Sequence, residues 1–240
     1  MVALIKYALA CTSFTALVLA APLTLVKRGV SGVQTQCKKG YFALTFDDGP
    51  YKYTEELVDI LNAKDVKATF FVNGNNFWDI DNNTDAQNAI KKAYHSGHQI
   101  ASHTWSHADL DSLSESGIQK EMEQLEDALM RVIGVKPAFM RPPYGNSNEK
   151  TTEVLNNLGY TVVTWNVDTK DYETHNLSEE MDNYKKELPL SNSGDGGIAL
   201  EHDVYKQTVE ELAASAIAFV EKQGYKFSTV ADCFDASPYQ

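Results

Sequence analysis

Residues 41–50, YFALTFDDGP, place an apolar, β-rich run directly before two adjacent aspartates and a Gly-Pro turn. A turn needs one Asp at most, because a single side chain can hydrogen-bond the backbone two residues on and let the chain bend. The turn therefore accounts for only one of the two carboxylates, Asp47 and Asp48. The pair is a candidate for chemistry at the end of a strand.

Short β-rich runs of this kind alternate with longer amphipathic segments along the rest of the chain. Seven strand candidates lie at 41–46, 67–72, 99–102, 138–141, 161–167, 197–201 and 226–230. Helix candidates begin near Thr54, Thr84, Ser114, Asn148, Ser178 and Gln207. This alternation predicts an α/β fold in which helices cover a parallel sheet, either an open doubly wound sheet or a closed barrel.

The first 28 residues are interpreted as segments that are removed from the mature protein. One early cation, Lys6, precedes an apolar stretch that ends in Val-Leu-Ala at 18–20, which is typical of a secretory signal peptide over residues 1–20. Lys27 and Arg28 form a candidate dibasic processing site, so residues 21–28 are a candidate pro-segment. Residues 29–240 show no repeat or linker that would divide them, which predicts one domain.

The remaining chain has the features of a secreted protein without a membrane anchor. No second apolar run is long enough to span a membrane, and the last ten residues, ADCFDASPYQ, lack the hydrophobic tail of a lipid-anchor signal. We therefore expect an extracellular or cell-wall location. Asn82 and Asn176 lie in Asn-X-Thr and Asn-X-Ser patterns and are candidate glycosylation sites in a secreted chain.

The three cysteines become one pair once the signal peptide is removed. Cys11 leaves with the signal, and Cys37 and Cys233 remain in an oxidising compartment. We predict a disulfide between them, which would tie the two ends of the domain together.

The net charge of the chain limits the classes of molecule that it is expected to bind. Three of the 21 cations lie in the first 28 residues, so 18 cations remain against 33 acids, a formal charge of −15. Such acidity argues against a nucleic-acid partner. It is compatible with a neutral or cationic substrate.

Polar clusters lie just past the ends of five strand candidates. They are DDGP (47–50), HTWSH (103–107), RPPYG (141–145), DTKDY (168–172) and EHD (201–203). In parallel α/β folds these strand ends open onto one face, where active sites are built. Five clusters on one rim predict one site.

Two of these clusters contain the residue types of a metal site. His103 and His107 are four apart, a spacing that lets two imidazoles converge on one ion. Asp48 or Asp47 supplies a carboxylate, which completes a set that leaves positions open for water and substrate. The other aspartate is then placed to take a proton from a water that attacks a carbonyl. Adjacent strand residues point to opposite sides, so the pair hardly flanks a glycosidic bond, and ester or amide hydrolysis is favoured.

TFDDGP, HTWSH, RPPYG, WNVDTKDY and ALEHD, in this order from about Cys37 to Cys233, resemble the motif set of the polysaccharide deacetylases, the NodB-like carbohydrate esterase family. Within it, secreted fungal chitin deacetylases are the most similar. The resemblance implies a distorted (β/α) barrel of about seven parallel strands with outer helices, forming a single catalytic domain. It also implies one divalent metal and removal of N-acetyl groups from N-acetylglucosamine units of chitin or chitooligosaccharides, giving chitosan and acetate.

The resemblance assigns the metal ligands and the base residue by residue. Asp47 matches the catalytic base, which also contacts substrate, and Asp48 matches a metal ligand. His103 and His107 match the other two ligands. Zn²⁺ suits this set, with Co²⁺ or Ni²⁺ as alternatives.

The remaining motifs match residues that assist the reaction. Tyr144 matches the residue whose main-chain N–H holds the oxyanion, and Arg141 matches the arginine that orients the base. His202 matches the general acid that protonates the leaving amine, and Asp171 matches its partner. Leu200 is a candidate for the acetyl methyl pocket and Trp105 for stacking on a sugar face, with a place in the core as the alternative for each. One residue departs from the family pattern: Tyr172 stands where a tryptophan is common.

Several alternatives stay open. An acetylxylan esterase or a peptidoglycan deacetylase would use the same machinery, and a carbohydrate-binding protein without activity is a third interpretation. We expect a monomer that acts on a polysaccharide or oligosaccharide.

Overall fold

The computed structural model describes residues 31–240. The predicted signal peptide, the candidate pro-segment and Cys11 lie outside the described residues. None of the helices within 31–240 is both long and apolar enough to cross a membrane.

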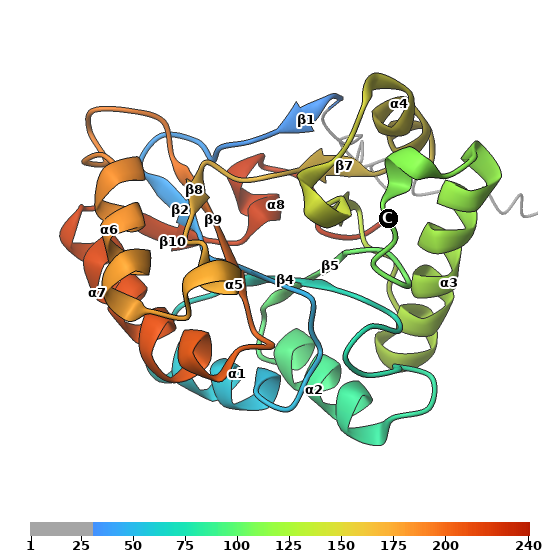
Figure 1. Ribbon diagram of the computed structural model, residues 1–240, viewed down its shortest axis with the longest axis horizontal. Coiled ribbons are helices and arrows are strands. Elements are labelled where there is room, and N and C mark those ends of the chain that lie inside the picture. The colour runs from blue at the N-terminus through green and yellow to red at the C-terminus, as the bar shows by residue number, and fades with distance from the viewer. Residues whose placement is uncertain (1–30) are drawn as a thin grey trace, which may run out of the picture.

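Helices surround a sheet of short parallel strands (Figure 1). The strands are β1 (Val33–Gln34), β2 (Tyr41–Ala43), β3 (Thr45–Asp47), β4 (Thr69–Val72), β5 (Gln99–Ser102), β6 (Phe139–Met140), β7 (Thr161–Val163), β8 (Val167–Asp168), β9 (Gly197–His202) and β10 (Lys226–Ser228). The helices are α1 (Thr54–Ala63), α2 (Thr84–His95), α3 (Glu115–Ile133), α4 (Glu149–Asn157), α5 (Asp171–Thr174), α6 (Leu177–Glu187), α7 (Ala213–Lys222) and α8 (Val230–Cys233). Two short 3₁₀ helices, η1 (Leu110–Ser112) and η2 (Pro143–Gly145), and a π-helical turn, η3 (Thr208–Leu212), complete them.

The predicted α/β fold with a parallel sheet and outer helices is confirmed. Its strand order is β1-β7-β6-β5-β4-β3-β9-β2-β10, with β8 paired to β9, and every pairing is parallel. All seven strand candidates form strands. The helix candidates also form, for example α3, which begins after the N-cap Ser114 and ends at left-handed Gly134.

The predicted barrel is not closed. The run 161–167, expected as one strand, is divided: β7 pairs with β6, whereas β8 pairs with β9. Residues 164–166 between them lie outside both strands, so the ring of strands is interrupted at this point. The run 41–46 is also divided, at Leu44, and β1 was not predicted. Within residues 31–240 there are therefore ten short strands, where about seven were predicted.

Alternate residues of the strands pack into hydrophobic clusters on the two sides of the sheet. One core lies between strands and outer helices and contains Phe42, Phe46 and Phe70. The other lies on the opposite side and takes one residue from each of six strands: Ala43, Phe71, Ala101, Phe139, Val163 and Ile198. This inner core is completed by α8, so the strands enclose side chains rather than a pore.

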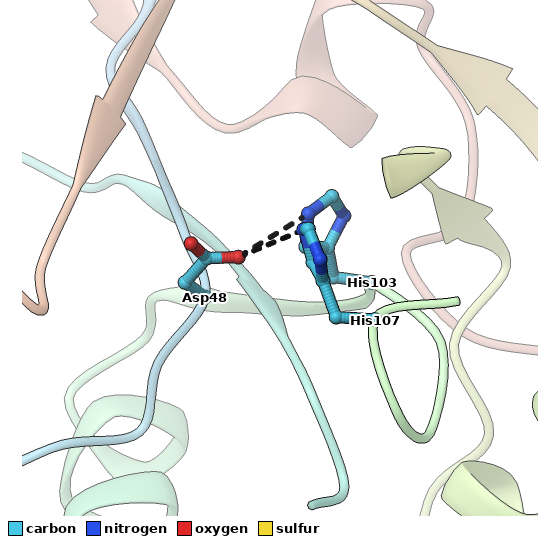
Figure 2. A group of neighbouring side chains, drawn as sticks. All are labelled: Asp48, His103 and His107. Atoms are coloured by element: carbon cyan, nitrogen blue, oxygen red, sulfur yellow. Dashed lines mark ion pairs between the residues drawn. The ribbon is translucent and has the colours of Figure 1, made fainter. Parts of the chain in front are cut away.

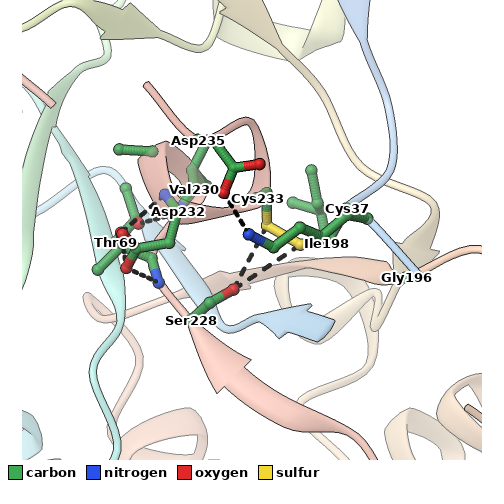
Figure 3. Close-up of a disulfide and its surroundings, with 12 residues drawn as sticks. Cys37, Thr69, Gly196, Ile198, Ser228, Val230, Asp232, Cys233 and Asp235 are labelled. Carbon is green, nitrogen blue, oxygen red and sulfur yellow. Dashed lines mark hydrogen bonds and ion pairs between the residues drawn. A yellow bond between two sulfur atoms is a disulfide. The ribbon is translucent and has the colours of Figure 1, made fainter. Parts of the chain in front are cut away.

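The predicted disulfide between Cys37 and Cys233 is confirmed (Figure 3). Both cysteines are buried in the inner core beside Ser228. The bond joins the segment before β2 to α8, across a sequence separation of 196 residues.

Candidate active site

Asp47 and Asp48 of the TFDDGP motif point in different directions, because β3 ends at Asp47 and Asp48 begins the loop that follows. Asp47 is the last residue of β3 and is 2% exposed. Asp48 has a φ of 74°, a left-handed conformation that few non-glycine residues adopt. One side chain therefore stays in the sheet and the other turns towards the loop that follows β5.

Asp48 meets both histidines of that loop (Figure 2). Its Oδ1 lies 3.5 Å from Nε2 of His103 and 3.3 Å from Nε2 of His107. His107 also has a left-handed backbone, with φ 57°, which points its ring back towards His103. The structure thus groups Asp48, rather than Asp47, with the two imidazoles.

His103 is set up to bind through Nε2. Its Nδ1 lies 2.7 Å from the carbonyl oxygen of Arg141, which can only accept, so the proton is on Nδ1 and the Nε2 lone pair is free. Burial lowers the pKa of His103 to about 3, in spite of the opposing charge of Asp48. The ring is therefore neutral, as a metal ligand must be.

The three side chains fit a divalent cation. Their candidate ligand atoms all lie within 4.8 Å of one another. Asp48 Oδ1 is buried and has no hydrogen-bond partner among the described residues. Two imidazoles and one carboxylate are the donors of a catalytic zinc site with open positions.

Asp47 is held by a buried arginine. The guanidinium of Arg141, which is fully buried, donates from Nη1 to Asp47 Oδ1 at 2.8 Å and to Thr45 Oγ1 at 2.7 Å. Burial raises the pKa of Asp47, whereas the charge of Arg141 opposes the rise. Its second oxygen, Oδ2, lies 3.9 Å from His103 Nε2 and faces the candidate metal site.

His202, at the end of β9, forms a second ion pair on the same rim. Its Nδ1 donates to Asp171 Oδ1 at 2.7 Å, and its main-chain N–H donates to Asp171 Oδ2, also at 2.7 Å. Thr208 Oγ1 donates to the same oxygen at 2.8 Å. Burial by itself lowers the pKa of His202, but the charge and hydrogen bond of Asp171 outweigh it and raise this pKa to about 9.

One cavity of about 320 Å³ connects the two pairs. Its wall consists of Asp47, Asp48, His103, His107, Pro142, Tyr144, Gly145, Trp165, Tyr172, Leu200, His202 and Tyr205. Tyr144 is 64% exposed, packs edge-on against His107 and has a left-handed backbone within η2, with φ 61°. Tyr172 packs edge-on against His202, so an aromatic ring lies beside this histidine although position 172 is not a tryptophan.

Trp105 is not brought to this cavity. It packs against the outer core and against Gly74, where a Cβ would overlap its ring. Trp165 lines the cavity instead. The two glycosylation candidates, Asn82 and Asn176, are exposed at the starts of α2 and α6.

Several residues that position the site were not predicted as site residues from the sequence. Thr45 receives a hydrogen bond from Arg141, and Trp165 packs against Gly145 in the cavity wall. Asp203 is buried, accepts a hydrogen bond from Thr54, and lies so close to Gly49 that a Cβ there would overlap its carboxylate. Of Thr45, Trp165 and Asp203, only Asp203 belonged to one of the five polar clusters, and its position next to His202 could have indicated a role in the site.

Comparison with known proteins agrees with this geometry. The family model described as polysaccharide deacetylase matches residues 34–163. A chitin deacetylase of Pestalotiopsis sp is 44% identical over 199 residues, which are 82% of this chain and 64% of that protein. A chitin deacetylase of Colletotrichum lindemuthianum is 38% identical over 226 residues, 91% of this chain and 90% of that protein. The solved structure of the chitin deacetylase from the same fungus superimposes with a TM-score of 0.84 at 37% identity and covers 87% of this chain and 95% of that one.

Proposed function

The chain belongs to the polysaccharide deacetylase family, and from this premise we propose that it is a secreted, metal-dependent deacetylase of chitin or chitooligosaccharides. One observation carries the proposal. A single cavity brings together an Asp–His–His metal site, a buried carboxylate held by arginine, and a histidine paired with a carboxylate. These are the parts that hydrolysis of an amide requires: an electrophilic ion, a base and an acid.

Asp48, His103 and His107 would hold the ion, which we propose is Zn²⁺. When bound, the ion supplies Lewis-acid polarisation of the substrate carbonyl and lowers the pKa of water. The protein contributes a neutral His103, whose tautomer the Arg141 carbonyl fixes.

Asp47 is proposed as the base. Arg141 fixes Oδ1, which leaves Oδ2 directed towards the metal site. A carboxylate in this position takes a proton from the attacking water. Its raised pKa makes it a stronger base than an exposed aspartate, and the charge of Arg141 favours its ionised form.

His202 is proposed as the acid. The leaving group of an amide is expelled far more easily as a neutral amine than as an amide anion, so a proton must reach its nitrogen. Asp171 keeps His202 protonated at neutral pH, and Nε2 is the ring atom not engaged by Asp171. The proton is therefore available at the cavity.

The cavity walls support an acetamido sugar as substrate. Leu200, from β9, is an apolar wall residue suited to the acetyl methyl group. The main-chain N–H of Tyr144 is proposed to donate to the oxyanion, and a preorganised donor of this kind lowers a barrier by roughly 3–4 kcal/mol. Trp165 and Tyr172 offer aromatic faces for the sugar ring.

The substrate is tested by acetate release from N-acetylglucosamine oligomers, acetylated xylan and peptidoglycan, measured side by side. Release from the chitin oligomers at the highest kcat/KM is the expected result. Activity on xylan or peptidoglycan alone would instead support the esterase or the peptidoglycan deacetylase. No release from any of them by metal-loaded protein would support a binding protein. Light scattering checks the proposed monomer.

A further inference from the structure

Asn73, the residue directly after β4, joins two loops that are distant in sequence. It is 1% exposed. Its main-chain N–H donates to the carbonyl of Gly49 at 2.8 Å. Its side-chain Nδ2 donates to the carbonyls of His103 and Thr104, the latter at 3.1 Å. Each of these carbonyls belongs to a candidate metal ligand or to its neighbour: His103 is a ligand, Gly49 follows Asp48, and Thr104 follows His103.

These contacts lie just past the ends of β3, β4 and β5, where the hydrogen bonds between strands stop. Asp48 and Thr104 both have left-handed backbones, with φ of 74° and 72°. Such residues redirect the carbonyls that follow them away from the regular ladder of hydrogen bonds. A buried carbonyl without a donor is costly. Asn73 supplies a donor to each loop, its main-chain N–H to the Gly49 carbonyl and its side-chain amide to the His103 carbonyl, and so ties them together; the Thr104 carbonyl also accepts from the main-chain N–H of Gly74 at 3.3 Å.

Two main-chain carbonyls fix the orientation of the Asn73 amide, because a carbonyl oxygen can only accept and must therefore face Nδ2. The other side-chain atom, Oδ1, lies 3.2 Å from Nδ2 of Asn76 and accepts a hydrogen bond from it. Asn76 itself is exposed. The Asn73 side chain therefore donates only towards the segment that carries His103, where both of its acceptors lie.

We propose that Asn73 is a positioning residue for the metal site, which sets the separation between the Asp48 carboxylate and the His103 imidazole. The inference rests on the metal-dependent function proposed above and goes beyond it, because Asn73 touches neither metal nor substrate. Residues that orient metal ligands typically change metal affinity by about 10–100-fold when they are replaced.

The test uses Asn73→Asp and Asn73→Ser, with Asn76→Asp as the matched control. Asn73→Asp keeps the shape of the side chain but replaces the donor by an oxygen that faces two carbonyls. Asn73→Ser removes the reach of the side chain without adding charge. Asn76→Asp makes the same chemical change three residues on, at an exposed position from which the new carboxylate can turn into solvent.

The Zn²⁺ dissociation constant of each metal-stripped protein is measured by competition with a chromogenic chelator. The thermal midpoint of each metal-free protein is measured beside it, and the visible spectrum of each Co²⁺-loaded protein reports ligand geometry. We expect both Asn73 variants to bind Zn²⁺ about 10–100-fold more weakly, with an altered Co²⁺ spectrum, and Asn76→Asp to match the wild type.

Two results separate this inference from the function on which it rests. Wild-type Zn²⁺ affinity and Co²⁺ spectrum in a folded Asn73 variant, whatever its thermal midpoint, would overturn the positioning role and leave the function intact. A wild-type protein that bound no Zn²⁺ or Co²⁺ would overturn both. If Asn73→Asp fails to fold, Asn73→Ser decides alone.

Discussion

Replacement of Asp171 by asparagine removes the charge that keeps His202 protonated. Asp171 accepts three hydrogen bonds, two of them from His202, and it raises the pKa of His202 from 6.5 to about 9. The asparagine side chain is nearly the same size but neutral, so the lowering effect of burial would then dominate and bring this pKa to 6.5 or below.

The magnitude follows from the protonated fraction of His202. At pH 8 this fraction falls from about 90% with a pKa near 9 to about 3% with a pKa near 6.5, so kcat/KM at that pH should fall by about 30-fold. The rate of a reaction that needs a protonated acid declines as the pH rises through the pKa of that acid. The basic limb of the pH–rate profile should therefore move to lower pH by about 2.5 pH units.

The assay is acetate release from a chitin oligomer between pH 5 and 10. Wild type and Asp171→Asn are loaded with the same metal, so the difference between their basic limbs reports the carboxylate. Asp168→Asn is the control, because Asp168 accepts hydrogen bonds from Lys170 and Tyr172 but none from His202. An Asp171→Asn enzyme with an unshifted basic limb would refute the assignment of His202 as the acid.

The same pair links stability to pH. Because the folded-state pKa of His202 lies above its ordinary value, the pair stabilises the fold fully below about pH 6.5, and this contribution is lost as the pH rises through about 9. Its size is about 3 kcal/mol. Urea unfolding of the metal-free wild type at pH 6 and pH 10, with Asp171→Asn as reference, measures it.

Three further outcomes are expected. Asp47→Asn should keep its metal, by elemental analysis, and lose about 10²–10⁴ in kcat, because the base is gone while the ligands remain; normal acetate release with metal bound would exclude Asp47 as base. Dialysis against a chelator should abolish activity and added Zn²⁺ should restore it, whereas a chelated protein that stayed active would exclude the metal mechanism. Cys37→Ser should lower the free energy of unfolding by up to about 5 kcal/mol, since the disulfide closes a long loop, and reduced wild type should unfold at the same urea concentration as the variant.

The sequence predicted the parts of the fold that depend on local pattern. Short β-rich runs located all seven strand candidates, and the capping residue Ser114 located the start of α3. Whether the ring of strands closes could not be predicted from the sequence, because the break between β7 and β8 depends on which neighbouring strand each half of 161–167 pairs with. Pairing between distant strands leaves no trace in a single run of residues.

The same limit applies to the site. Asp47, Asp48, His103, His107 and His202 were accessible because strand ends of a parallel sheet share a rim. Trp105 belonged to a predicted rim cluster and Trp165 to a predicted strand, yet of the two only Trp165 lines the cavity. Asn73 had no signal at all, because its importance lies in the two carbonyls that it meets.

The left-handed residues of the site have a consequence for how the family can evolve. Asp48, His107 and Tyr144 are held in a conformation that costs about 1 kcal/mol or more for each non-glycine residue. In the metal-free protein no metal binding offsets this backbone strain. The substitution His107→Gly would relax the backbone but remove a candidate metal ligand. Loss of function is thus a downhill step for the metal-free fold. Selection for activity, rather than for stability, must therefore maintain the ligand loops.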